Sequence, residues 1–92
     1  MTKTEVLQSI VDVLSFVQSM SGRKPVNIAP NTCPIGDLEQ FDSLNGVEAT
    51  VELSTRLGIE LPGSNAFVNG DGTKALTVSE IADAILQLAG AA

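Results

Sequence analysis

The chain has 92 residues, of which 11 are acidic and 5 are basic, and its net charge is −6 at pH 7. This negative charge repels the phosphates of nucleic acids and of anionic membranes and favours basic protein surfaces as partners. The length allows one domain, residues 1–92, with a small core. Because the sequence has three Phe and no Trp or Tyr, that core must consist mainly of Val, Leu, Ile and Ala.

The single cysteine, Cys33, excludes an internal disulfide. The chain has no His, so a catalytic thiol or a zinc site would lack its usual partners, and Cys33 is expected to be an ordinary loop residue. The sequence shows no charged leader, long apolar run or lipidation signal. We therefore expect a cytoplasmic protein without stable membrane insertion.

The first predicted element is an amphipathic helix from Thr4 to about Ser19. Its inward residues are Val6, Leu7, Ile10, Val11, Val13, Leu14 and Val17, and its polar face holds Gln8, Asp12, Ser15 and Gln18. The next segment, from Gly22 to Gln40, contains three prolines and is predicted to be one long loop. Its apolar residues, which we expect to plug the core, are Val26, Ile28, Ile35 and Leu38.

A second amphipathic helix is predicted to start near Asp42 or Ser43, which are both good cap residues. It should end at Leu57, where Gly58 supplies the left-handed residue that commonly closes a helix. A helical wheel places these residues on a broad inner arc: Leu44, Val47, Thr50, Val51, Leu53, Ser54 and Leu57. Leu44 lies at the edge of this arc, where it would either anchor the helix start in the core or, as we expect, stay partly exposed. The same wheel places these residues outside: Asn45, Glu48, Glu52 and Arg56.

The segment between Leu61 and Ala75 is rich in Pro, Gly, Asn and Asp and predicts a loop with at most one short helix. A last helix should open at Thr77, where Glu80 completes a capping box. Its inward residues are Val78, Ile81, Ala82, Ile85, Leu86 and Leu88, and Ala91 and Ala92 are expected to fray. Together these elements predict an all-α fold, a small antiparallel bundle of three main helices with a long first loop.

The tetrapeptide Phe41-Asp42-Ser43-Leu44 lies where the long loop meets the acidic second helix. Here the chain resembles the acyl carrier protein family, whose attachment serine lies in an Asp-Ser-Leu motif at the start of the second helix. The tripeptide alone is a weak signal, but other landmarks resemble the family in the same order. They are Ile35-Gly36-Asp37-Leu38, Val47-Glu48, Leu57-Gly58-Ile59-Glu60-Leu61-Pro62 and Leu76-Thr77-Val78.

The resemblance implies that Ser43 carries a 4′-phosphopantetheine arm, which a magnesium-dependent phosphopantetheinyl transferase moves from coenzyme A. The thiol of the arm would carry acyl groups as thioesters among enzymes of fatty-acid, lipid or polyketide biosynthesis. The chain itself is not expected to be an enzyme or to hold a metal ion, because it offers no base, metal site or nucleophile of its own. We expect a monomer that docks weakly and quickly on its clients.

Five residues around Ser43 are candidates for recognition by the transferase and the client enzymes: Asp42, Leu44, Asn45, Glu48 and Glu52. Asp42 would contact a bridging cation during modification, or would only cap the helix. Glu48 and Glu52 lie four residues apart and would present carboxylates to basic docking patches. The plainer alternative is a solvated face on which Glu52 pairs with Arg56.

Four features depart from the common form of the family and favour a specialised carrier. Phe41 stands where a small residue is usual, Asn45 stands where an acid is usual, and Arg56 interrupts a typically acidic stretch. The loop after Leu61 is also longer than the usual connection.

Three other functions compete with an acyl carrier. One is an acidic helical docking module that is never modified, and another is a peptidyl or aminoacyl carrier of nonribosomal synthesis. The third is a calcium loop, since Asn69, Asp71, Thr73 and Glu80 occupy its first, third, fifth and twelfth positions. Lys74 argues against calcium, because it stands in the sixth position, where a glycine is needed.

Overall fold

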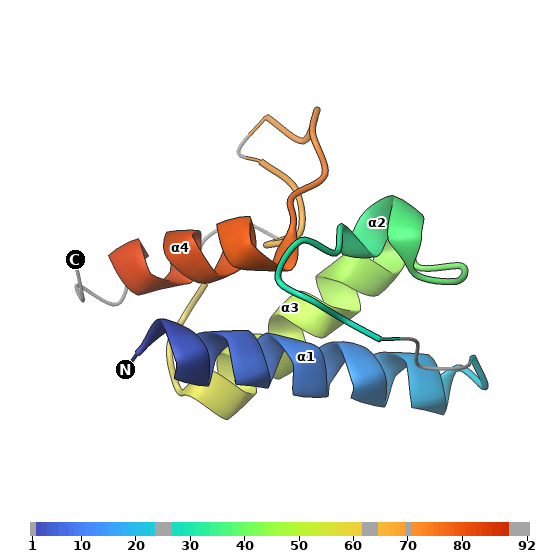
Figure 1. Ribbon diagram of the computed structural model, residues 1–92, viewed down its shortest axis with the longest axis horizontal. Helices are drawn as coiled ribbons and strands as arrows, with labels where there is room; N and C mark the ends of the chain where they lie inside the picture. Colours follow the sequence, from blue (N-terminus) through green and yellow to red (C-terminus); the bar gives the residue numbers. More distant parts are fainter. Residues whose placement is uncertain (1, 24–26, 62–64, 70, 89–92) are drawn as a thin grey trace.

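The computed structural model describes residues 2–23, 27–61, 65–69 and 71–88. This part of the chain forms four helices: α1 (Lys3–Met20), α2 (Pro34–Asp37), α3 (Ser43–Leu57) and α4 (Val78–Leu88). Helix α1 packs against both α3 and α4, and α4 runs back along α1 in the opposite direction (Figure 1). The described residues contain no strand, only an isolated bridge between Val68 and Ala75. The predicted all-α bundle is confirmed at this level.

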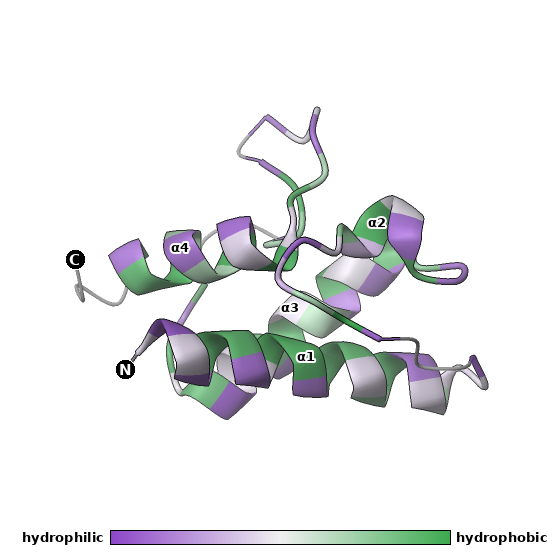
Figure 2. Cartoon of the chain, viewed as in Figure 1, coloured by the Kyte–Doolittle hydropathy of each residue, from purple (hydrophilic) through white to green (hydrophobic). Residues whose placement is uncertain are grey.

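Helix α1 begins and ends one residue outside the predicted range. Thr2 is its N-cap: the Thr2 hydroxyl accepts from the Glu5 N–H at 3.2 Å, and the Glu5 carboxylate accepts from the Thr2 N–H at 2.8 Å. The inward residues Val6, Ile10, Val13, Leu14 and Val17 are buried, as predicted, and Leu7 packs against them. Helix α1 therefore supplies five buried residues to the core, and hydrophobic residues recur along its ribbon in Figure 2.

Gln18 was expected on the polar face of α1, and that prediction is wrong. The side chain is only 1% exposed, because its amide nitrogen donates to the carbonyl of Glu39 at 2.9 Å. A buried amide of this kind is tolerated only when its polar atoms are paired. Periodicity along one helix cannot reveal a partner that lies in a distant loop.

The long first loop contains the short element α2, which the sequence did not predict there. It is an irregular turn, since Ile35 and Gly36 have non-helical dihedral angles and Gly36 has φ 120°. Between α3 and α4 the sequence predicted a loop with at most one short helix, and no helix forms among the described residues there. The predicted core plugs are confirmed for Leu38, which is buried, and for Ile28 and Ile35, which pack against the core; Val26 lies outside the described residues.

Helix α4 starts as predicted, with a capping box between Thr77 and Glu80. The Thr77 N–H donates to the Glu80 carboxylate at 2.9 Å, and the Glu80 N–H donates to the Thr77 hydroxyl at 3.2 Å. The first loop completes this helix start, because the N–H groups of Val78 and Ser79 donate to the carbonyls of Thr32 and Pro30. The first loop is thus fixed across the bundle.

The inward face of α4 is confirmed at four positions, Val78, Ile81, Ala82 and Ile85, and Leu86 packs against the core. Leu88 was also predicted to point inward, but it is 51% exposed because the buried core ends one turn earlier, at Ile85. Ala91 and Ala92 lie outside the described residues. No helix in the described ranges is both long and apolar enough to cross a membrane.

Candidate functional site

Ser43 is the first residue of α3, and its side chain is exposed. Asp42 is the N-cap, with extended backbone, and its carboxylate accepts from the Asn45 N–H at 3.1 Å. The prediction that Asp42 caps the helix is therefore confirmed. Its contact with a bridging cation during modification stays a prediction. Among the described residues, the Ser43 hydroxyl and the N–H groups of Ser43 and Leu44 have no hydrogen-bond partner. The serine thus lies at the positive end of a helix dipole with donors still available.

Phe41, which directly precedes the Asp42-Ser43-Leu44 motif, anchors the chain in the core. Its ring is 4% exposed and packs edge-to-face against the ring of Phe67, with centroids 5.6 Å apart. One turn later, Leu44 is 68% exposed. The chain therefore passes from the core to the surface within four residues, and Ser43 lies at the exposed end of a fixed segment.

The exposure of Leu44 agrees with its position at the edge of the inner arc of α3, where partial exposure and contact with partners were expected. Val51, placed on the same arc, is 64% exposed. Thr50 and Leu53 are buried and Leu57 packs against the core, as predicted, but the buried face of α3 also holds Asn45, Gly46 and Ala49. The buried face is displaced from the predicted arc because the Asn65 side chain lies against Gly46 and the Ala66 N–H donates to the Thr50 hydroxyl, contacts that hydropathy alone does not predict.

Asn45 was predicted on the outer face, and that placement is wrong. The side chain is 9% exposed. Its carbonyl oxygen accepts from the Asp42 N–H at 3.3 Å and from the Arg23 guanidinium at 3.3 Å. Asn45 therefore completes a capping box with Asp42, which draws the side chain back toward the helix start.

The two candidate glutamates of α3 differ in their surroundings. Glu48 is exposed, and among the described residues it forms no ion pair. Glu52 is paired with Arg56 at 3.2 Å, and the Arg56 guanidinium lies 5.2 Å from the centre of the Phe16 ring. The predicted Glu52–Arg56 pair is confirmed. Glu48 is thus the more available carboxylate on this face.

A polar cluster at the end of α1 escaped the sequence reasoning. Arg23 connects the Asn45 side chain to that of Gln18, whose carbonyl oxygen lies 3.5 Å from the guanidinium. Gln18 in turn holds the carbonyl of Glu39, just before the motif. The cluster ties the start of α3 to the end of α1. No sequence signal marks it, because its members come from three separate segments.

A second set of contacts attaches the 65–67 segment to the first turns of α3. The Asn65 amide nitrogen donates to the carbonyl of Ser43 at 3.1 Å, and the Asn65 carbonyl oxygen accepts from the Phe67 N–H at 2.9 Å. The Thr50 hydroxyl donates to the carbonyl of Gly46 at 2.7 Å and accepts from the Ala66 N–H at 2.9 Å. The glycine inside the predicted helix was the one available signal of this close approach.

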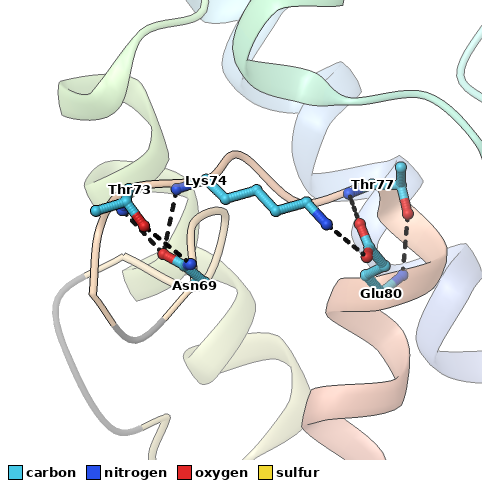
Figure 3. A network of polar contacts seen from close by, with 5 residues as sticks. All are labelled: Asn69, Thr73, Lys74, Thr77 and Glu80. Carbon is cyan, nitrogen blue, oxygen red and sulfur yellow. Dashed lines mark hydrogen bonds and ion pairs between the residues drawn. The ribbon is translucent and has the colours of Figure 1, made fainter.

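The residues of the calcium pattern serve local structure (Figure 3). The Asn69 side-chain oxygen accepts from the N–H groups of Thr73 and Lys74, and Lys74 lies 3.6 Å from the Glu80 carboxylate. The bond from the Thr77 N–H is the main cause that lowers the pKa of Glu80. Across the described ranges, no three His, Cys, Asp or Glu side chains gather closely enough to hold a metal ion.

Cys33 is the N-cap residue of α2, and its side chain is half-buried. Its sulfur lies 3.4 Å from the carbonyl of Ile35. Burial, and next the nearby Asp37 carboxylate, raise the pKa of the thiol. The thiolate, which is the reactive form, is therefore disfavoured at neutral pH.

Comparisons of the chain with protein-family models, with curated proteins and with solved structures find no match.

Proposed function

We propose that this chain is an acyl carrier, which holds acyl intermediates as thioesters on a 4′-phosphopantetheine arm attached to Ser43. It would deliver them to enzymes of fatty-acid, lipid or polyketide biosynthesis. The observation that carries this proposal is the exposed Ser43 hydroxyl at the first residue of α3, between a buried Phe41 and an exposed Leu44. The ordered landmarks from Ile35 to Val78 support it, because they place this serine where the carrier family has its attachment site.

The surroundings of Ser43 fit a phosphodiester. The N–H groups of Ser43 and Leu44 have no partner among the described residues, and an anion at a helix N-terminus is stabilised by about 0.3–1 kcal/mol. When bound, the arm supplies the thiol that forms the thioester. The protein contributes a fixed and accessible attachment point, and the partner enzymes contribute the reacting groups.

Asp42 is adjacent to the serine and exposed. One of its carboxylate oxygens caps the Asn45 N–H, and the other has no hydrogen-bond partner within the described segments. We propose that this second oxygen contacts the magnesium ion of the phosphopantetheinyl transferase during modification. The cap fixes the carboxylate for that contact.

The face of α3 beside Ser43 is suited to basic client enzymes. It combines the exposed Leu44 with the carboxylate of Glu48, which forms no ion pair within the described ranges, and the chain carries a net charge of −6. Such a face raises encounter rates through electrostatic steering while the small contact area keeps dissociation fast. Glu52 contributes less charge to the partner, because Arg56 offsets it.

The departures from the common motif support a specialised carrier. Phe41 takes the place of a small residue and fills the core beside Phe67. Asn45 takes the place of an acid and turns inward. The surface that α3 offers next to Ser43 is therefore less acidic than in the common form of the family.

The test is the intact mass of the purified protein after incubation with coenzyme A, magnesium and a broad-specificity phosphopantetheinyl transferase. We expect a phosphopantetheine mass increment in the parent protein and in Ser21→Ala, a control at another exposed serine, and no increment in Ser43→Ala. Circular dichroism should show that all three proteins are folded. If the folded parent gains no increment from an active enzyme, the proposal fails and an unmodified docking module becomes the better explanation.

Loading of the modified protein then separates acyl from aminoacyl cargo. Acyl-transferring enzymes should charge the arm of the parent protein, while amino-acid adenylating enzymes should not. The reverse result would assign the chain to nonribosomal peptide synthesis.

A further inference from the structure

We propose that Asn65 is a positioning residue for the modification of Ser43, and that it couples the 65–67 segment to the attachment serine. This inference rests on the proposed carrier function. Its basis is the bond from the Asn65 amide to the carbonyl of Ser43, the same residue whose hydroxyl would be modified. The backbone conformation at Ser43 sets the direction of that hydroxyl, so a contact that fixes the backbone also orients the reacting oxygen.

The Asn65 side chain is held at both ends. Its nitrogen donates to Ser43 at 3.1 Å, and its oxygen accepts from the N–H of Phe67 at 2.9 Å. Phe67 is fully buried and packs on Phe41, two residues before Ser43. The side-chain amide of Asn65 therefore connects a residue of the core, Phe67, to the attachment residue, Ser43.

Gly46 leaves the space that this side chain occupies. A Cβ atom at position 46 would lie 2.6 Å from the Asn65 oxygen and 2.8 Å from its nitrogen. A glycine in a helix interior is less stabilising than an alanine. The helix thus gives up local stability at the position where Asn65 lies against it.

Asn65 also lies at the base of a paired arm. The N–H of Leu76 donates to the carbonyl of Phe67, and the N–H of Asn69 donates to the carbonyl of Lys74, both at 2.9 Å. In Figure 1 this arm projects from the bundle, above α4, and its described residues from Asp71 to Lys74 are exposed.

The experiment compares Asn65→Asp with Thr50→Val. Asn65→Asp keeps the acceptor for Phe67 and removes the donor to Ser43, whereas Thr50→Val removes the hydroxyl bonds to Gly46 and Ala66 and leaves Ser43 untouched. Both variants loosen the same segment on the same helix. Only the first changes a contact of the attachment residue.

Two readouts are measured on full-length protein that circular dichroism shows to be folded. The first is kcat and KM of phosphopantetheine transfer from coenzyme A, where we expect kcat to fall about tenfold in Asn65→Asp and to stay within about twofold of the parent in Thr50→Val. The second is the carbonyl ¹³C shift of Ser43 before modification, which should move upfield in Asn65→Asp alone because a hydrogen-bond donor has been removed.

Equal losses of kcat in the two variants would overturn the inference, because they would show that general loosening of the segment is the cause. An unchanged kcat or an unchanged Ser43 carbonyl shift in Asn65→Asp would also overturn it. None of these three results contradicts the carrier function, since the parent protein is still modified. A parent protein that gains no phosphopantetheine would instead refute the carrier function and the positioning role with it.

Discussion

The contact between Gly46 and Asn65 makes an unusual prediction for a helix: Gly46→Ala should destabilise the protein. In an ordinary helix interior, alanine is more stable than glycine by about 0.8–1 kcal/mol. Here the added Cβ would lie 2.6–3.0 Å from three side-chain atoms of Asn65, which must therefore move away. That movement breaks the bonds to Ser43 and Phe67.

The magnitude follows from these two opposing effects. Two hydrogen bonds contribute about 0.5–1.5 kcal/mol each, so their loss costs about 1–3 kcal/mol. After the gain in helix propensity of about 1 kcal/mol is subtracted, Gly46→Ala should lower the free energy of unfolding by about 1 kcal/mol. In an Asn65→Ala background the three clashing atoms are gone, and the same substitution should raise it by about 1 kcal/mol.

Urea unfolding followed by circular dichroism, applied to all four members of this double-mutant cycle, measures the coupling directly. We expect a coupling energy of about 2 kcal/mol between the two positions. If Gly46→Ala stabilises the parent and the Asn65→Ala protein equally, Asn65 does not lie on Gly46 in solution. The positioning role of Asn65 would then lose its structural basis.

Two further predictions concern the core beside the motif and the start of α4. Phe41→Ala should lower the free energy of unfolding by about 3–5 kcal/mol, because it empties a buried site against Phe67, whereas Ser43→Ala should change it by less than about 0.5 kcal/mol; similar urea midpoints for both variants would contradict the buried position of Phe41. The pKa of Glu80 is lowered in the folded state, so its stabilising contribution is present above the pKa of the unfolded chain, about 4.3, and is lost as the pH falls through the lower folded value. The urea midpoint of Glu80→Gln should therefore fall less between pH 7 and pH 3 than that of the parent, and an identical fall in both proteins would refute this role of Glu80.

Helix caps and apolar periodicity were predictable because they depend on residues close in sequence. The capping box of Thr77 with Glu80, the cap of α3 at Asp42 and the left-handed Gly58 after Leu57 were all found where the sequence predicted them. Each depends on contacts within one turn of helix. The same holds for the exposed position of Ser43, since a residue at a helix start has no preceding turn to cover it.

The errors share a different cause, which is contact with a distant segment. Gln18 and Asn45 are polar and were placed in solvent, but each finds a buried partner through Arg23 or the loop before α3. Val51 is apolar and was placed in the core, but it is 64% exposed, because the 65–67 segment binds the side of α3 that carries Gly46 and Thr50. Hydropathy describes the preference of a side chain and does not show which neighbour is available to satisfy it.

The sequence by itself therefore determined the three long helices, the caps at the starts of α3 and α4, and the serine at the start of α3 that makes the chain a candidate carrier. Only the tertiary structure decided which face of α3 is buried and which residues hold the Ser43 turn. The physical reason is the range of the interactions: caps and periodicity act over three or four residues. The bond from Asn65 to the carbonyl of Ser43 spans 22 positions and forms only when the folded core brings the two segments together.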